Sequence, residues 1–138
     1  MEWSPISKPR DALQRAPNLA DYPAAYRDFS WDQVRAQLDG LPGGGLNIAH
    51  EALFRHVQGP AADRVAIRFL AQGAAAQDCT YRELATDARR FANVLVQLGV
   101  QRGERVASLM GRVPTLYATV LGTLAAGAIY CPLFSAFG

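Results

Sequence analysis

The residue types that carry nucleophilic or metal chemistry are few and widely separated in this chain. His50 and His56 lie six positions apart, so on a helix they would point to different sides and make poor co-ligands for a metal. Cys79 and Cys131 are 52 positions apart, which excludes a C-x-x-C metal or redox pair and leaves one disulfide conceivable. No Ser-His-Asp or Cys-His set is evident either. The sequence therefore predicts no catalytic residue and no metal ligand.

The sequence offers equally little for a glycine-rich phosphate loop. The chain has 13 arginines but a single lysine, Lys8, which follows "MEWSPIS", so no G-x-x-x-x-G-K-[ST] motif can be written. The one glycine cluster, Gly43-Gly44-Gly45 within "LPGGG", follows no predicted strand and lacks a lysine. We therefore interpret residues 41–45 as a flexible connector rather than as a phosphate loop.

Composition excludes several function classes. The 138 residues carry 14 basic and 12 acidic side chains, and a net charge of +2 provides no basic face for nucleic acid. The first residues lack the apolar core of a secretory signal. Half of the residues are apolar, as in ordinary globular domains. We expect a cytoplasmic protein with reduced thiols and no nucleic-acid partner.

The elements that must position any site begin with two short helices. "SWDQVRAQLDG" offers Ser30 as an N-cap and Gly40 as a stop, with apolar residues at helical spacing between them. "LNIAHEALFRHVQG" repeats apolar residues in the same way and ends at Gly59-Pro60. The alternation in "RVAIRFLA", residues 64–71, then predicts a strand, and "QGAAAQD" predicts a turn.

The clearest predicted element is a long amphipathic helix in "TYRELATDARRFANVLVQLG". Thr80 and Glu83 have the spacing of a capping box, and Gly99 has the position of a C-terminal cap. Steps of four and three residues predict one buried stripe made of Leu84, Ala88, Phe91, Leu95 and Leu98. The opposite face is polar and is expected to contact solvent.

From residue 113 to residue 138 the sequence has no charged side chain, which raises the alternative of a membrane segment. Pro114 and Gly127 divide this stretch into a helix of three to four turns and a separate strand, "AIYCPLF", whereas a spanning helix needs about 20 continuous apolar residues. With a strand in "ERVASLM", the order from Arg64 onward is β-α-β-α-β, which predicts parallel pairing through crossover helices. The predicted class is α/β, with no membrane partner.

Several blocks of this sequence resemble the beginning of AMP-forming acetate–CoA ligases, a branch of the adenylate-forming acyl-CoA ligase superfamily. These blocks are "NLADYPAAYRDFSW", "LNIAHEALFRHV", "TYRELATDARRFANVLVQLGVQRGERVASLM" and "RVPTLYATVLGTLAAGAIYCPLFSAFG". The resemblance covers about residues 18–138. Where relatives usually carry Asp in the second helix, Phe54 stands here, as an extra core residue or as a contact with the rest of an enzyme.

The resemblance implies a two-step reaction in which acetate and ATP, with Mg²⁺, form acetyl-AMP and coenzyme A then displaces AMP. It implies that the phosphate loop and the catalytic lysine lie beyond Gly138. Residues 1–45 would then be an N-terminal extension and linker, and residues 46–138 the start of an incomplete N-terminal domain. Such a fragment is expected to be inactive alone and to expose a sheet edge through which it self-associates.

The resemblance also implies that the arginine preceding "FAN" helps to form the entrance for coenzyme A. That residue is Arg90, with Arg89 beside it, and a guanidinium is well suited to hold a phosphate. Gly73, in the loop after the first strand, is a further candidate at this entrance. The alternative for both arginines is a solvated helix face paired with Asp87 or Glu83. A stand-alone nucleotide- or CoA-binding module remains the second functional hypothesis.

Overall fold

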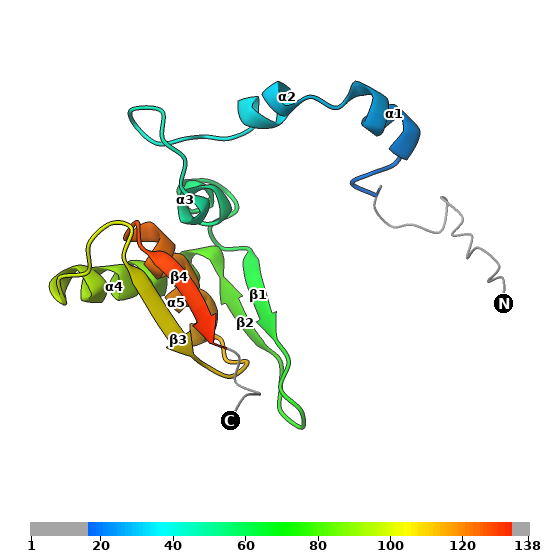
Figure 1. The fold of residues 1–138 in the computed structure, drawn as a ribbon. Coiled ribbons are helices and arrows are strands. Elements are labelled where there is room, and N and C mark those ends of the chain that lie inside the picture. The colour runs from blue at the N-terminus through cyan, green and yellow to red at the C-terminus, as the bar shows by residue number, and fades with distance from the viewer. Residues whose placement is uncertain (1–16, 134–138) are drawn as a thin grey trace, which may run out of the picture. The chain divides into compact units, whose positions relative to one another are not determined.

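The computed structural model describes residues 17–133 and divides the chain into two units, Met1–Gln37 and Leu38–Gly138. The described part of the first unit contains two short helices, α1 (Tyr22–Asp28) and α2 (Trp31–Ala36) (Figure 1). Neither helix contains a buried residue.

The N-cap predicted for the second of these helices is confirmed. The Ser30 hydroxyl accepts a hydrogen bond from the Asp32 amide, which satisfies one of the free N–H groups at the start of α2. The helix ends at Ala36, earlier than the predicted stop at Gly40. Gly40 instead adopts a φ of +74°, a backbone conformation that favours glycine.

The second unit begins with a helix that the sequence predicted as one piece and the structure divides into two. Helix α3 (Ile48–Ala52) is followed by a 3₁₀-helix, η2 (Phe54–Gln58). Leu53 separates them with φ −132° and ψ −62°, outside the helical region. Its side chain is 1% exposed and lies in the core, so burial of Leu53 accompanies the change of helix type.

The strand predicted at residues 64–71 forms as β1 (Val65–Phe69), but its pairing differs from the prediction. It pairs antiparallel with β2 (Gln77–Thr80), from Val65 opposite Thr80 to Phe69 opposite Gln77. The sequence pattern predicts Gln77 and Asp78 in the turn "QGAAAQD" and Thr80 at the start of the next helix, so it predicts no strand here. The short connection between the two segments permits a hairpin, whereas parallel pairing requires a crossover, so β1 belongs to no parallel sheet among the described residues.

Helix α4 (Tyr81–Gln97) follows β2 directly and confirms the predicted capping box. The Glu83 amide donates to the Thr80 hydroxyl, and the Glu83 carboxylate accepts from the Thr80 amide at 2.8 Å. Of the predicted stripe, Leu84, Ala88 and Leu95 are buried and Phe91 is half-buried, whereas Leu98 is 75% exposed.

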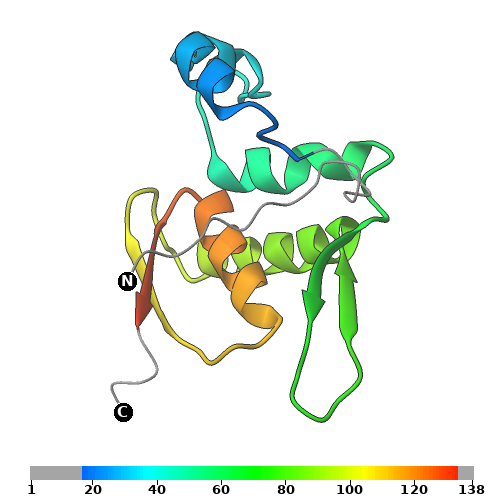
Figure 2. The same cartoon turned by 90° about the vertical axis from the view of Figure 1, so that its right-hand side faces the viewer.

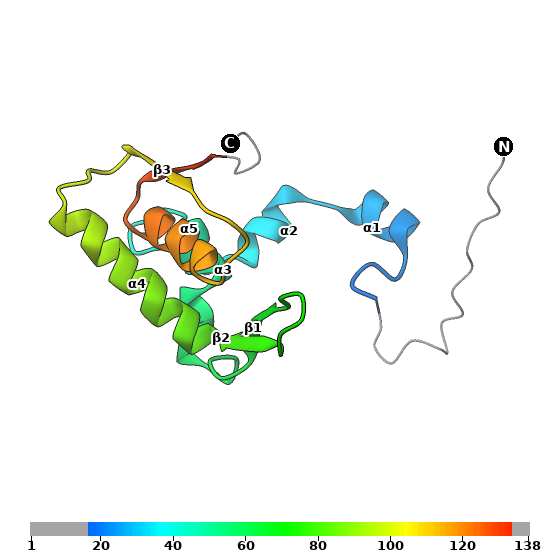
Figure 3. The same cartoon turned by 90° about the horizontal axis from the view of Figure 1, so that it is seen from below.

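The last three elements confirm the α/β class and the parallel crossover. Strand β3 (Arg105–Leu109) leads through helix α5 (Thr115–Ala125) to strand β4 (Ile129–Leu133), and the two strands pair in parallel from Arg105 opposite Ile129 to Leu109 opposite Leu133. Figures 2 and 3 show α5 packed against α4, and Figure 3 shows it between α4 and the two strands. No helix among the described residues is long and apolar enough to cross a membrane.

The core of the second unit is built largely from small side chains where α4 and α5 meet. The buried cluster is Leu53, Leu84, Ala85, Ala88 and Ala118. At Gly122 on α5, a Cβ atom would lie 2.6 Å from the carbonyl oxygen of Ala88, so only glycine permits this approach.

Candidate functional site

The predicted residue Arg90 lies on an open groove formed by β2 and the N-terminal half of α4. This groove, called the Arg90 groove below, has a volume of about 420 Å³ and is lined by Asp78, Cys79, Arg82, Glu83, Thr86, Asp87 and Arg90. It exists because the capping box starts α4 immediately after β2, which places the strand end beside the first three turns of the helix.

Each arginine at the Arg90 groove already has a carboxylate partner. Arg82 binds Asp63 through two hydrogen bonds, of which the shorter is 2.8 Å. Arg90 lies 3.4 Å from Asp87 on the same helix face. Both pairs are exposed to solvent, which screens the charges, so neither pair adds much to the stability of the fold. This is the solvated-face arrangement that the sequence left open.

Hydrogen bonds favour the ionised forms of two groove carboxylates, Glu83 and Asp78. The pKa of Glu83 lies below its ordinary value because the Thr80 amide and hydroxyl donate hydrogen bonds to it. Hydrogen bonds from Arg68, just outside the groove, lower the pKa of Asp78 in the same way. The pKa of the Cys79 thiol is raised, first by burial and then by the nearby carboxylates. The groove therefore presents three negative and two positive side chains to a ligand.

The three predicted site residues do not come together in one place. Arg89 is exposed, does not line the Arg90 groove, and has its guanidinium carbon 4.8 Å from the ring centroid of Phe54. Phe54 itself packs against the core cluster. Gly73 lies in the turn of the β1–β2 hairpin with a φ of +74°, at the end of the strands remote from α4 (Figure 1).

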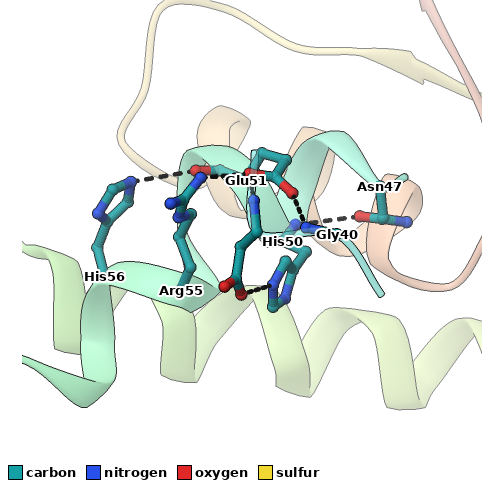
Figure 4. Close-up of polar contacts among 7 residues, drawn as sticks. Gly40, Asn47, His50, Glu51, Arg55 and His56 are labelled. Atoms are coloured by element: carbon teal, nitrogen blue, oxygen red, sulfur yellow. Dashed lines mark hydrogen bonds and ion pairs between the residues drawn. The ribbon is translucent and has the colours of Figure 1, made fainter. Parts of the chain in front are cut away.

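The densest polar cluster among the described residues was not predicted. The Glu51 carboxylate, with its side chain only 15% exposed, accepts hydrogen bonds from the Gly40 amide at 2.7 Å, from the Asp39 amide at 3.1 Å and from Arg55 at 2.6 Å (Figure 4). His50 and Asp39 complete this cluster, the Glu51 network, through a 2.6 Å contact. These bonds, led by the one from Gly40, lower the pKa of Glu51.

The Glu51 network is a structural arrangement that connects residues 39–40 to α3. The ion pair between Glu51 and Arg55 could have been predicted from the sequence, because the two residues have the i, i+4 spacing of a helical ion pair. The hydrogen bonds from Asp39 and Gly40 could not have been predicted from the sequence, since they join residues eleven or twelve positions apart across a loop. The two histidines contact different partners, as expected from their spacing. His50 contacts Asp39, whereas His56 contacts the Glu51 carbonyl and the Tyr81 ring.

Two further expectations concern thiols and metals. Cys79 in β2 and Cys131 in β4 are both free thiols. Within residues 17–133, no group of three or more His, Cys, Asp or Glu side chains has an arrangement that could hold a metal ion.

Comparison with known proteins assigns this fold to a family. Residues 53–138 match the family model described as "AMP-binding enzyme". The acetyl-coenzyme A synthetase of Bacillus subtilis is 35% identical over 127 residues, which are 91% of this chain and 22% of that protein. The 3-hydroxypropionyl-coenzyme A synthetase of Metallosphaera sedula is 30% identical over 78% of this chain and 17% of its own length.

A solved structure shows the same fold. The Brucella canis acyl-CoA synthetase superposes with a TM-score of 0.75 and 37% identity, covering 85% of this chain and 21% of that protein. The chain belongs to the AMP-binding enzymes, because the family model matches more than half of its residues. Within that family its homologues include the acetyl-coenzyme A synthetases of Bacillus subtilis and Streptomyces coelicolor. The chain spans about a fifth of the length of the Bacillus subtilis relative.

Proposed function

We propose that this chain acts as part of an AMP-forming acetate–CoA ligase in the cytoplasm. In the reaction, a carboxylate oxygen of acetate attacks the α-phosphorus of ATP and pyrophosphate leaves. The thiol of coenzyme A then attacks the acyl carbon, AMP leaves and the thiol proton is released. The observation that carries the proposal is the 35% identity to an acetyl-coenzyme A synthetase over 91% of the chain. The stand-alone binding module is not favoured, since the relatives named above are synthetases.

The described residues supply the scaffold of such an enzyme rather than its chemistry. A triphosphate with Mg²⁺ requires a cradle of amide groups and cations. The Arg90 groove does not fit a triphosphate, because its three carboxylates outnumber its two arginines and leave it with a net negative charge. We therefore assign ATP and Mg²⁺ to no residue of this chain and derive no step through them.

A contact with a phosphate on the nucleotide end of coenzyme A is the role we propose for Arg90. Its ion pair with Asp87 is long and exposed, so exchanging it for a phosphate costs little. Arg89 lies beside it on α4, and Gly73 is a weaker candidate because the hairpin turn lies at the other end of β1 and β2. The proposal rests on the family resemblance and on the accessibility of Arg90.

Exchange of the matched region tests the ligase proposal. The 127 matched residues of this chain replace their counterparts in the Bacillus subtilis synthetase, and acetyl-CoA and AMP formation are measured against the unmodified parent. We expect a folded and active chimera, because the exchanged region carries the same fold. A chimera that folds, as shown by its circular dichroism and elution volume, yet forms no acetyl-CoA would overturn the proposal.

The role of Arg90 is tested in the same chimera with coenzyme A and with dephospho-coenzyme A, which lacks the 3′-phosphate. Arg90→Ala is expected to raise the KM for coenzyme A about tenfold and to leave the KM for the dephospho form nearly unchanged. The matched control is Arg82→Ala, on the same groove. Equal effects of Arg90→Ala on both substrates would remove Arg90 from this role.

A further inference from the structure

A second cavity lies at the carboxyl ends of the parallel strands β3 and β4. Its volume is about 300 Å³, and its walls include Ser108, Arg112, Leu116, Tyr130, Pro132 and Leu133. In open α/β sheets, ligands bind in the crevice outside the carboxyl ends of the strands. The cavity, called the strand-end cavity, therefore has the position of a ligand site and a size that suits a small ligand.

On the polar side of the strand-end cavity, one hydroxyl hydrogen is not used in a hydrogen bond among the described residues. Ser108 on β3 and Tyr130 on β4 lie on the same face of the strand pair, and their hydroxyl oxygens are 2.5 Å apart. Two hydroxyls carry two hydrogens, and the bond between them uses one. Neither hydroxyl has another hydrogen-bond partner in the described part of the chain, so one O–H remains able to donate to an acceptor in the cavity.

The charge of the strand-end cavity is the opposite of that of the Arg90 groove. Among the described residues that line the cavity, Arg112, in the loop between β3 and α5, is the one charged side chain, and no carboxylate contributes. Arg112 forms no ion pair with any residue of 17–133, whereas Arg68, Arg82 and Arg90 all do. A guanidinium brings five N–H donors in a planar fork that matches carboxylate and phosphate oxygens.

Another arginine beside a hollow, Arg102, has a structural explanation that Arg112 lacks. Arg102 lines a hollow at the end of α5, where its Cγ lies 3.2 Å from the position of a Cβ on Gly127. A cation there is favoured by the carbonyl groups at the helix C-terminus. Arg112 instead precedes the N-terminus of α5, where no free helix carbonyl groups attract a cation.

We propose that the strand-end cavity binds a small anion with an apolar body, a carboxylate or a phosphate monoester, with Arg112 and the Ser108–Tyr130 hydroxyl pair holding the charged group. Leu116, Pro132 and Leu133 form the apolar wall on which the rest of the ligand packs. The site is separate from the Arg90 groove, and its binding does not depend on ligase activity.

Calorimetric titration of the full chain tests the site with three probes that share a four-carbon tail: butyrate, butyl phosphate and 1-butanol. We expect saturable binding of butyrate, of butyl phosphate or of both, and this result identifies the charged group that the site accepts. Neutral 1-butanol is expected to bind at least about tenfold more weakly, because it cannot use the charge of Arg112. Equal binding of 1-butanol, or no saturable binding of either anion, would overturn the proposal.

Single substitutions test whether the anion binds in the strand-end cavity. Arg112→Gln is expected to weaken the anion about tenfold or more, and Tyr130→Phe about threefold, by removal of a charged and a neutral hydrogen bond respectively. Arg105→Gln removes the same charge from the opposite end of β3 and is expected to change affinity less than twofold. Equal losses in Arg112→Gln and Arg105→Gln would show non-specific attraction and contradict the proposal. Amide chemical shifts of the unsubstituted chain give an independent check, with changes expected at Ser108, Arg112 and Tyr130.

Discussion

At the scale of single residues, Glu51 carries the largest concentration of hydrogen bonds in the described chain. Folding lowers the pKa of its carboxyl group, first through the bond from the Gly40 amide. A carboxyl whose pKa is lowered stabilises the fold above its ordinary value of 4.5, and this contribution is lost as pH falls through the lowered pKa.

We therefore expect Glu51→Gln to lower the melting temperature at neutral pH, because a neutral amide cannot accept from both backbone groups and from Arg55. The difference from the unsubstituted chain should shrink as pH falls and vanish below the lowered pKa. Thermal unfolding followed by circular dichroism between pH 7 and pH 3 measures this, with Asp32→Asn as a control outside the network. A difference that stays constant across this range would contradict the assignment.

Arg89 and Phe54 provide a second residue-scale prediction. Their stacking is an exposed cation–π contact, which contributes about 0.5–1 kcal/mol. A double-mutant cycle of Arg89→Ala and Phe54→Leu in urea unfolding should yield a coupling energy of that size. The cycle with Arg90→Ala in place of Arg89→Ala should yield a coupling near zero, and equal coupling in the two cycles would refute the specific contact.

What the sequence predicted at this scale was local. The Ser30 cap and the Thr80–Glu83 capping box depend on residues two or three positions apart, so their spacing was sufficient. The bonds of Glu51 to Gly40 and of Ser108 to Tyr130 depend on how loops and strands meet, and no spacing reveals them. Arg90 was proposed from the family resemblance, and its pairing with Asp87 is one of the alternatives that the sequence left open.

At the scale of elements, the contact between α4 and α5 depends on Gly122. Replacing it by Ala adds a methyl group that would lie 2.6 Å from the Ala88 carbonyl oxygen. The better helix propensity of Ala offers about 1 kcal/mol, whereas forced separation of packed helices costs about 1–3 kcal/mol. We expect Gly122→Ala to destabilise the chain in urea unfolding, while Gly59→Ala, at a position with open space, should not. A stabilised Gly122→Ala variant would show that the helices can move apart freely.

The elements differed in how well the sequence predicted them. Helix α4 was predicted because its apolar periodicity, its capping box and its glycine stop agree. The β3-α5-β4 unit was predicted because Pro114 and Gly127 bound an apolar helix between two strand-like segments. Strand β2 was missed because its backbone pairing with β1, rather than its side chains, makes it a strand. The break at Leu53 was missed because the apolar spacing continues through it, and tertiary packing decides the helix type there.

At the scale of the whole molecule, the two units differ in what they bury. Since α1 and α2 have no buried residue, a chain that begins at Leu38 should have a free energy of unfolding within about 0.5 kcal/mol of that of a chain that begins at Pro17. A chain that begins at Leu41 also lacks the Asp39 and Gly40 amides and should melt at a lower temperature. Thermal unfolding of both truncations measures this, and equal melting temperatures would show that the Glu51 network adds no stability.

The unpaired edges of the second sheet lead to a prediction about association between chains. Strands β3 and β4 each have one partner among the described residues, and Leu109 and Leu133 are 67% and 53% exposed. Exposed edges with apolar side chains favour pairing between chains. We expect concentration-dependent association in sedimentation velocity, reduced by Leu109→Lys. A monomer at every concentration would contradict this expectation.

The Glu51 network also determines how the chain responds to mechanical load. A force applied at the N-terminus and resisted at the C-terminus passes through Asp39 and Gly40, whose amides are attached to α3 by the Glu51 carboxylate. These hydrogen bonds must break before tension reaches residues 41–47, so until then they carry the load from Asp39 and Gly40 directly to α3. In an optical trap, an early low-force extension step that disappears in Glu51→Gln is the signature of this anchor.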